Sequence, residues 1–318
     1  TLPGQKVQSA WELKLGWSSE QSRETYLGLS DEDFEATPYR RYAASGLGLM
    51  SWNRTQAELS WQLQVGQDLS IRAVGYHHWQ QRSWRKVHGF VDGPDVGSLV
   101  ARPGSGQAAV FFAVLRGDSD SEGAAQDLLV GTNAREFHAY GGQVVGRWNF
   151  ERGIFSQDLE VGLRLHGDSI DRDHSDESFS MRGGVLVPVG DDPVLTTVNR
   201  GEALAFSAHV HDDLGIGPVR ILPGLRVEVV RTAFRDELAD EQTDALRAAV
   251  LPGLGLHVQP TYGLGIFAGV HRGFSPVSPG QAEEVLPETS WNYEGGARLS
   301  WRGTQAEAVG FFSDYSNL

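Results

Sequence analysis

Two histidines in the second half of the chain have the spacing of a pair of metal ligands. His209 and His211 are separated by one residue, and Asp212 follows directly. Residues i and i+2 of a strand point to the same face, so both imidazoles can reach one metal ion. The pair lies beside a glycine-containing turn at 214–217, far from the long loops. A hydrated wall explains both side chains better, and no metal site is predicted there.

Two acidic clusters carry the oxygen ligands that calcium prefers. Residues Asp118 to Gly123 (DSDSEG) begin like a calcium-binding loop, but its twelfth position is Leu129, where such a loop needs a bidentate glutamate. The second cluster, Asp171 to Glu177 (DRDHSDE), has no calcium-loop spacing. Solvated, acid-rich loops explain both clusters, so the sequence predicts no bound cation.

No motif in the chain predicts an enzyme. There is no cysteine, no His-Glu-x-x-His, no P-loop and no Gly-x-Ser-x-Gly elbow. The 27 basic and 41 acidic residues give a net charge of −14, which argues against a nucleic-acid partner. The longest apolar run, AAVFFAVL at 108–115, is far shorter than the roughly 20 residues of a membrane helix. We expect no enzymatic activity and no covalently bound cofactor.

The elements that position these residues show the two-residue period of β-strands. Between Trp291 and Arg302, apolar side chains occupy one face of the predicted strand and polar side chains the other. Phe155 to His166 shows the same pattern most clearly. Its apolar residues are Leu159, Val161, Leu163 and Leu165, and its polar residues include Asp158, Glu160 and Arg164. We expect the first set to contact lipid and the second to face a water-filled lumen.

The connections between the predicted strands alternate in length. About eleven strands are expected, with short connections near 67, 152, 215, 261 and 303 and long ones near 30, 110, 185, 243 and 281. The long loop from Gly167 to about Gly201 is expected to contain a small hairpin of 184–189 and 194–198. The segment Asp236 to Val250 has the composition of a helix. This rhythm favours an all-β fold, an antiparallel up-and-down transmembrane β-barrel with long extracellular loops.

A soluble extracellular β-sheet binding domain is the alternative, because alternation alone also fits a half-buried sheet. The strongly ionic face opposite the apolar one favours the barrel. Several predicted strands exceed the roughly 9–11 residues that cross hydrocarbon, so they should project beyond the membrane on the side of the loops.

Several stretches resemble TonB-dependent outer-membrane receptors, particularly the branch of ferric-citrate receptors. They are YLGLSDEDFEATPYRRYAAS (26–45), GTNAREF (131–137), LPGLRVEVVRT (222–232), GVHRGFSPVSPG (269–280) and PETSWNYEGGARLSWRGTQAEAVGFFSDYSNL (287–318). The most specific is the GFSP loop followed by Pro-Glu-x-Ser-x-x-Tyr-Glu-x-Gly-x-Arg. The resemblance covers essentially the whole chain. A receptor of this family has a barrel of about 22 strands and an N-terminal plug. Residues 1–318 are therefore expected to be a partial barrel domain, without the plug and the C-terminal strands.

The resemblance implies energy-coupled uptake of a ferric chelate, ferric citrate or a siderophore, across the bacterial outer membrane. The implied partners are the chelate, the inner-membrane TonB complex acting through the plug, and outer-membrane lipid and lipopolysaccharide. A passive outer-membrane porin is the alternative transporter, since a porin needs neither a plug nor energy coupling.

Such chelates are anionic, and guanidinium groups pair well with carboxylates, so arginines near the loop ends of the strands are the candidate ligand-binding residues. They are Arg40, Arg41, Arg82, Arg85, Arg135, Arg172 and Arg182, with Trp84 and Trp79 as packing partners. Arg82 and Arg85 flank Trp84 where one strand ends, and Arg135 lies where the next begins. If these two strands pair, the arginines are expected to converge on one mouth of the lumen.

Overall fold

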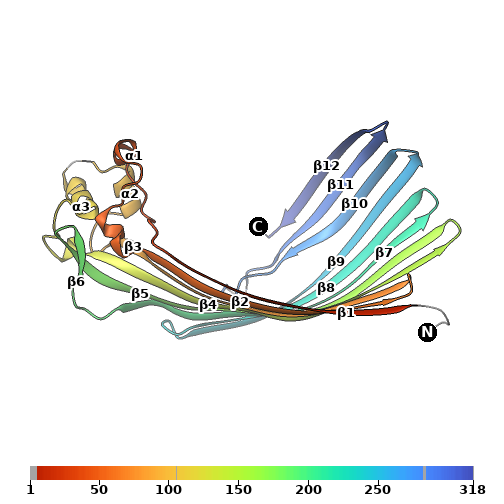
Figure 1. Ribbon diagram of the computed structural model, residues 1–318, viewed down its shortest axis with the longest axis horizontal. Helices are drawn as coiled ribbons and strands as arrows, with labels where there is room; N and C mark the ends of the chain where they lie inside the picture. Colours follow the sequence, from red (N-terminus) through yellow and green to blue (C-terminus); the bar gives the residue numbers. More distant parts are fainter. Residues whose placement is uncertain (1–5, 105, 282–283, 318) are drawn as a thin grey trace.

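The computed structural model describes residues 6–104, 106–281 and 284–317, and within them strands dominate. Eleven of these strands form one antiparallel sheet in which neighbours in sequence are neighbours in space, and a short additional strand pairs only with β5 (Figure 1). The path consists of β1 (Val7–Ser22), β2 (Leu49–Val65), β3 (Leu69–Phe90), β4 (Leu128–Arg152), β5 (Phe155–Arg182), β7 (Val194–Ile216), β8 (Val219–Asp236), β9 (Glu241–Thr261), β10 (Leu264–Ser275), β11 (Glu288–Trp301) and β12 (Thr304–Ser316), and the additional strand is β6 (Val185–Pro188). This confirms the predicted all-β up-and-down topology.

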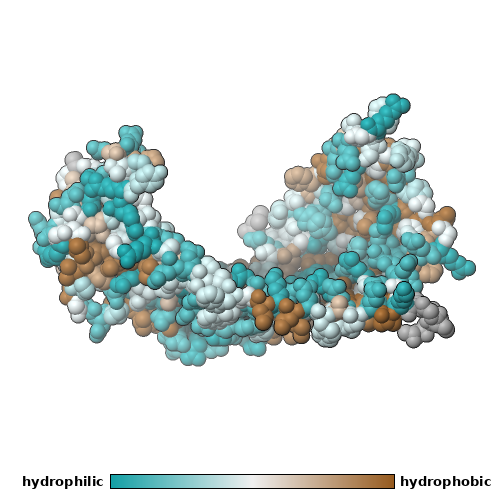
Figure 2. Space-filling model, viewed as in Figure 1, coloured by the Kyte–Doolittle hydropathy of each residue, from teal (hydrophilic) through white to brown (hydrophobic). Residues whose placement is uncertain are grey.

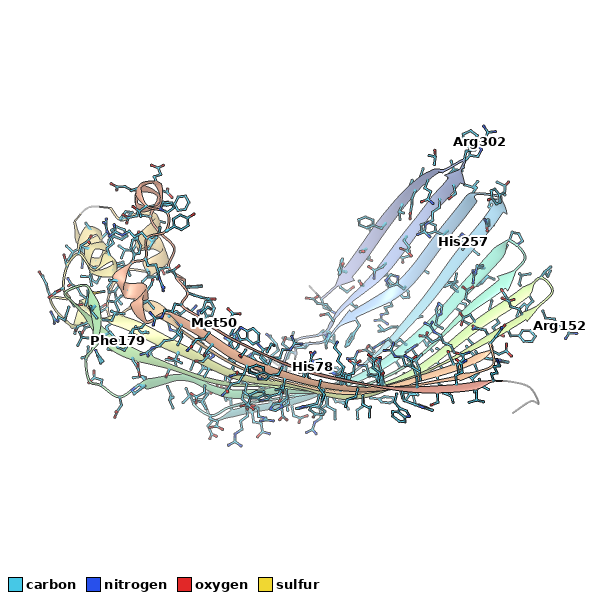
Figure 3. The ribbon with its side chains drawn as sticks, in the orientation of Figure 1. Met50, His78, Arg152, Phe179, His257 and Arg302 are labelled. Atoms are coloured by element: carbon cyan, nitrogen blue, oxygen red, sulfur yellow. The ribbon has the colours of Figure 1, made fainter. Side chains whose placement is uncertain are left out.

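Tight turns join the strands at one end of the sheet, and glycines in the left-handed region occupy all five predicted short connections. They are Gly66, Gly153, Gly217, Gly263 and Gly303, with φ between 58° and 84°. Glycine reaches this region without the steric cost that a Cβ brings. Figure 3 shows Arg152 and Arg302 at this end, and Phe179 at the opposite end beside the helices.

The register places apolar and polar side chains on opposite faces across many strands. Trp61, Ala73, Val144 and Leu163 are direct cross-strand partners in turn, and so are their neighbours Ser60, Val74, Gln143 and Arg164. Ser60 and Val74 are buried, whereas Leu163 is 52% exposed. Side chains crowd one another on the concave face of a curved sheet and are therefore less exposed there. The face that carries Ser60 and Val74 is consequently the inner, concave one. In Figure 3, His78, which lies four residues after Val74 on β3 and so on the same face, is on the concave side.

The outer face changes from apolar to ionic along the strands. One row across four strands consists of Gly75, Gly142, Leu165 and Phe206, and the next row toward the helices brings in His77 and Tyr140. Beyond these rows the outer face carries ionic side chains. The apolar band therefore ends near Tyr140, and strands such as the 28-residue β5 extend well past it. Brown patches of apolar side chains are visible on the surface of the sheet in Figure 2.

Short helices cover the far ends of β3 to β6 and form the main apolar core. They are α1 (Asp31–Ala36), η1 (Ala43–Leu47), α2 (Val96–Ala101), α3 (Gln107–Arg116) and η2 (Ala124–Gln126). Leu115, Leu128 and Met181 are fully buried between helices and strands. We name this unit the helical cap. Among the described residues, no helix has the length and apolar character needed to cross a membrane.

Three expectations about the loops are wrong. Residues 236–250 form no helix: a turn follows β8, and β9 pairs with it from Glu241 onward. Residues 167–182 continue β5 instead of starting a loop. The segments 184–189 and 194–198 do not pair with each other, since β6 and β7 both pair with β5. The connections near 185 and 243 are consequently short.

Candidate functional site

Three predicted arginines lie in one row on the inner face. Arg82 on β3 is the direct partner of Arg135 on β4, and Arg135 is the direct partner of Arg172 on β5. Direct partners in an antiparallel sheet point to the same face, and neighbouring strands are about 4.8 Å apart. We call these residues the arginine row. They lie beyond the apolar band, between it and the helical cap.

The contacts that the described residues make with the arginine row are with neutral groups. Arg135 donates from Nε to Nε2 of His174 at 3.2 Å, and Arg172 donates to Oδ1 of Asn199 at 3.2 Å. The guanidinium of Arg82 lies over the ring of Phe137, 5.9 Å from its centroid, and its Nε is buried without a hydrogen-bond partner. Among the described residues, no carboxylate forms an ion pair with any of the three arginines. Three like charges in direct register repel one another unless an anion joins them.

Burial and like charge both act on the ionisable groups here. Burial lowers the pKa of Arg135, and the charges of Arg82 and Arg172 lower it further. The pKa of His174 is also lowered, first by burial and then by Arg135 and Arg172. His174 accepts a hydrogen bond from Arg135, which requires a neutral imidazole. The site therefore resists additional positive charge and favours a negative partner.

Apolar side chains line the arginine row on the side of the membrane. Ile170 and Phe234 belong to the next row of the inner face. The loop between β10 and β11 reaches this row, because a Cβ added to Gly280 would lie 3.1 Å from Cγ of Phe234. A Cβ added to Gly201 would likewise lie 3.5 Å from Pro279. In Figure 1 this loop runs back toward the middle of the sheet.

Three other predicted arginines belong to the helical cap. Arg40 pairs with Asp33 at 3.3 Å and with Asp118 at 3.8 Å. Arg41 donates to two backbone carbonyls, and Arg182 donates to the carbonyl of Ser121 at 2.7 Å. These bonds hold loop segments of the cap together, so the structure does not bring the three residues to the arginine row.

Arg85 and the two tryptophans lie on β3 but not all on one face. Arg85 lies on the outer face, where it pairs with Glu177 at 2.5 Å and stacks over Phe179. Trp79 lies on the same face and donates to Glu136 at 2.9 Å. Trp84 lies on the inner face, one row above Arg82, and meets Tyr26 edge-on at 5.2 Å. Of the predicted residues, Arg82, Arg135, Arg172 and Trp84 therefore share one part of the inner face.

The candidate metal ligands have other partners. Nε2 of His209 lies 3.0 Å from Glu160, and Asp118 pairs with Arg116 at 2.9 Å. Asp171 lies within β5, where Arg200 pairs with it at 3.1 Å. No group of three or more histidine or acidic side chains within the described residues is placed to hold a metal ion.

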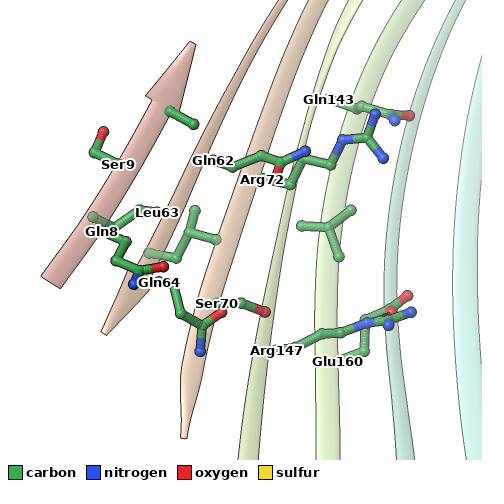
Figure 4. Close-up of a pocket in the computed structure, with 13 residues that line it drawn as sticks. Gln8, Ser9, Gln62, Leu63, Gln64, Ser70, Arg72, Gln143, Arg147 and Glu160 are labelled. Atoms are coloured by element: carbon green, nitrogen blue, oxygen red, sulfur yellow. Dashed lines mark hydrogen bonds and ion pairs between the residues drawn. The ribbon is translucent and has the colours of Figure 1, made fainter. Parts of the chain in front are cut away.

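The inner face also has a polar concavity near the tight turns. It has a volume of about 640 Å³ and is lined mainly by glutamines of β1, β2 and β4, with Arg72 and an Arg147–Glu160 ion pair (Figure 4). Amide side chains both donate and accept hydrogen bonds, so this part of the wall suits water or a polypeptide better than a concentrated anion.

His174, Asn199 and Phe234 complete the surroundings of the arginine row, and sequence reasoning missed them. The first two lie in the stretch that was expected to be a long loop. His174 lies two residues from Arg172 on β5 and therefore shares its face, but Asn199 and Phe234 lie on β7 and β8, and only the register places them beside the row.

Comparisons with known proteins agree with this geometry. The sequence matches the family described as TonB dependent receptor-like, beta-barrel, over residues 6–318. The chain belongs to the TonB-dependent receptor β-barrel family. Proteins of this family reside in the outer membrane of Gram-negative bacteria, and this is an outer-membrane protein.

Solved structures of TonB-dependent receptors share the fold. The ferric citrate transporter FecA matches with a TM-score of 0.72 and 18% identity, over 96% of this chain and 40% of FecA. The siderophore receptor PiuA from Acinetobacter baumannii gives 0.69 and 12%, over 95% and 47%. The ferric-catecholate import receptor Fiu from E. coli K12 gives 0.66 and 11%, over 97% and 49%. The chain thus spans less than half the length of these structures. No curated protein sequence matched.

Proposed function

We propose that this receptor barrel serves the energy-coupled uptake of an anionic ferric chelate, with the arginine row as part of the chelate-binding site. The observation that carries the proposal is the set of three guanidinium groups in register on the inner face, none of which forms an ion pair with a carboxylate of the described residues. The family implies the energy source, which is the inner-membrane TonB complex acting through a plug domain. The ferric chelate is the transported ligand, and no covalently bound cofactor is expected.

Charge explains why an anion is the fitting ligand. The chain has a net charge of −14, so an anionic chelate is repelled by the average field and needs a local basic surface. The arginine row supplies this surface beyond the apolar band, where the lumen opens toward the loops. Its charges repel one another in the unliganded protein, and a bound anion removes that repulsion.

Guanidinium geometry favours carboxylate oxygens. Each guanidinium offers N–H donors in a planar fork that matches a carboxylate in two parallel hydrogen bonds. Spacing of about 4.8 Å between strands lets neighbouring arginines bind neighbouring carboxylates of one ligand. A ferric polycarboxylate such as ferric citrate fits this row best, and hydroxamate oxygens of a siderophore are a second possibility. Trp84 and Phe137 offer apolar contacts on either side.

The structural neighbours support iron uptake in general. A ferric citrate transporter, a siderophore receptor and a ferric-catecholate receptor all share this barrel. Outer-membrane lipid and lipopolysaccharide are the proposed partners of the outer face, and a nucleic-acid partner is not expected. A soluble binding domain does not fit an outer-membrane family.

Uptake measurements in cells test the proposal. Cells that express the full-length receptor should accumulate radiolabelled ferric citrate only while the proton-motive force and TonB are intact. An Arg135→Ala receptor, present at equal level in the outer membrane, should accumulate much less at low chelate concentration. Uptake that persists after loss of TonB would instead indicate a passive porin and overturn the proposal.

A further inference from the structure

Two histidines on the outer face lie close together just beyond the apolar band. His77 on β3 is the direct partner of Tyr140 on β4, and His138 precedes Tyr140 by two residues. His77 and His138 are therefore diagonal neighbours on one face, and Nε2 of His77 lies 3.4 Å from Nδ1 of His138. Among the described residues, His77 has no other hydrogen-bond partner. We call these two residues the histidine pair.

The side chains around the histidine pair bring two of its ring nitrogens together. The ring of Tyr140 lies over β5, since a Cβ added to Gly167 would be 2.5 Å from Cζ of Tyr140. His77 consequently reaches past its direct partner on β4. Trp79 follows the same diagonal to Glu136 and donates from Nε1 to Oε1 at 2.9 Å. The local structure thus favours diagonal contacts between β3 and β4.

Glu136 fixes the proton of His138. Nε2 of His138 lies 3.1 Å from Oε1 of Glu136, and an ionised carboxylate only accepts hydrogen bonds, so the proton is on Nε2. In the neutral imidazole the free lone pair is then on Nδ1, the atom nearest His77. Histidines that bind metal ions commonly donate their other ring N–H to a carboxylate in this way.

The distance between the two nitrogens fits a tetrahedral metal ion better than a hydrogen bond. Nitrogen donors usually lie about 2.7–3.2 Å from their acceptors, so 3.4 Å is long for a hydrogen bond between two rings. Zinc binds histidine nitrogen at about 2.1 Å with tetrahedral angles, which places two such nitrogens about 3.4 Å apart. A square-planar ion such as Cu²⁺ would place them about 3.0 Å apart.

We propose that the histidine pair binds one zinc ion, with Glu136 as the carboxylate that orients His138 and with water molecules as the remaining ligands. Imidazole is a preferred ligand of zinc, whereas Mg²⁺ and Ca²⁺ prefer oxygen ligands. The ion links β3 to β4 on the outer face.

The charges around the histidine pair permit a cation. Arg200 and Arg231 line the polar pocket of about 440 Å³ that contains both histidines. Glu202 pairs with the first arginine and Asp244 with the second, so each guanidinium charge is compensated. Asp168, which also lines the pocket, adds a negative charge. A zinc ion therefore meets no excess of positive charge.

The position of the histidine pair gives an ion access from solution. Its row is the first one beyond the apolar band, and the side chain of His77 is exposed. The same two strands carry Arg82 and Arg135 on the inner face. The inference is independent of the proposed chelate, because the two sites lie on opposite faces and bind ligands of opposite charge.

Zinc counting on the purified full-length receptor tests the assignment. The protein carries no polyhistidine tag and is dialysed in detergent against low micromolar zinc chloride, and bound zinc is measured by elemental mass spectrometry. The unmodified receptor should retain one more zinc ion than His77→Gln or His138→Gln. His78→Gln is the matched control and should retain as much zinc as the unmodified receptor, because His78 is adjacent in sequence but lies on the inner face (Figure 3).

Two further measurements separate the metal site from a structural role of the same residues. Glu136→Gln should weaken zinc binding about tenfold, since loss of an orienting carboxylate costs about 10- to 100-fold in metal affinity. Zinc should raise the midpoint of thermal unfolding of the unmodified receptor, because the ion binds the folded protein, and should leave that of His77→Gln unchanged. With zinc removed by a chelator, both proteins should unfold at the same temperature.

Equal zinc content in the unmodified receptor, His77→Gln and His138→Gln would overturn the assignment. So would an equal loss in His78→Gln, since this would show zinc held by histidines in general. Ferric citrate binding, measured without zinc, should be the same in all three histidine variants, so the outcome is separate from that of the proposed function.

Discussion

Arg135 has an unfavourable position in the unliganded barrel. It lies between Arg82 and Arg172, and it donates a hydrogen bond to the neutral imidazole of His174. Sites that bind charged ligands often reduce stability in this way, because the ligand later supplies the missing partner. Arg85, three residues from Arg82 in sequence, has its charge balanced by Glu177 on the other face of the sheet.

Replacement of Arg135 should therefore separate stability from binding. Arg135→Gln removes the central positive charge and should stabilise the unliganded receptor by about 0.5–2 kcal/mol while it weakens chelate binding. The midpoint of thermal unfolding of the purified full-length receptor measures the first effect. Arg85→Gln is the control, and it should lower the midpoint, since it leaves Glu177 without its partner. If Arg135→Gln also lowered the midpoint of thermal unfolding, the result would contradict repulsion among the three arginines.

His174 should make chelate binding depend on pH. Its pKa lies below the ordinary value of 6.5 because of burial and the charges of Arg135 and Arg172. His88 and Asp173 also act on it. A pKa that is lower in the folded than in the unfolded state means that the unfolded chain binds more protons below about pH 6.5. The contribution of neutral His174 to the stability of the unliganded receptor is therefore lost as the pH falls from 6.5 toward the lowered pKa.

A bound anion should reverse this shift, since it favours the imidazolium. The receptor should take up a fraction of a proton when it binds the chelate near pH 6, and calorimetry in buffers of different ionisation enthalpy measures this uptake. His174→Gln keeps an acceptor for Arg135 but does not titrate, and it should abolish this proton uptake. Equal proton uptake by both proteins would remove His174 from the account.

At the scale of elements, the apolar band was predictable and the extended ends of the strands were not. Inside the band, Leu159 to Leu165 alternate with polar residues because one face meets lipid and the other water. Beyond the band, residues 167–178 of β5 are polar on both faces except at Ile170, so the two-residue period disappears and the segment resembles a loop. In residues 236–250, alanine and glutamate suggest a helix, but pairing of β9 with β8 overrides this local preference.

The candidate site was predictable only in part for the same reason. Arginines near the strand ends are visible in the sequence, but a shift of register by one residue moves a side chain to the other face. Arg82 and Arg85 differ by three residues, an odd number, and hence point to opposite faces of β3. Only the register of β3, β4 and β5 shows that Arg82, Arg135 and Arg172 form one row.

Val161 tests the assignment of faces on β5. It is 47% exposed on the apolar face, in the middle of the alternating segment. Val161→Arg should reduce the stability of the folded barrel by roughly 2–4 kcal/mol if this position lies near the midplane of the bilayer. Gln143→Arg places the same side chain on the inner face of β4 and should have little effect. Denaturant titrations in lipid vesicles compare the two, and a larger loss for Gln143→Arg would reverse the faces.

At the scale of the whole molecule, the two ends of the sheet differ in construction. Tight glycine turns occupy one end, and the helical cap with its buried core occupies the other (Figure 1). The difference matches a barrel whose short turns lie in the periplasm and whose long segments lie outside the cell.

Tag accessibility on intact cells tests this orientation. A short epitope inserted at Asp118, next to α3, should be accessible to antibody from outside. An epitope at Gln67, in the turn between β2 and β3, should become accessible only after the outer membrane is opened. Access to both sites from outside would be incompatible with the topology.

The affinity of the purified full-length receptor for ferric citrate tests the central claim most directly. Arg82→Ala, Arg135→Ala and Arg172→Ala should each weaken equilibrium binding by roughly 10- to 100-fold, since each removes charge-assisted hydrogen bonds. Arg220→Ala, near the tight turns, is the control and should bind normally. Unchanged affinity in all three variants of the arginine row, at low and moderate salt, would show that the row does not bind the chelate.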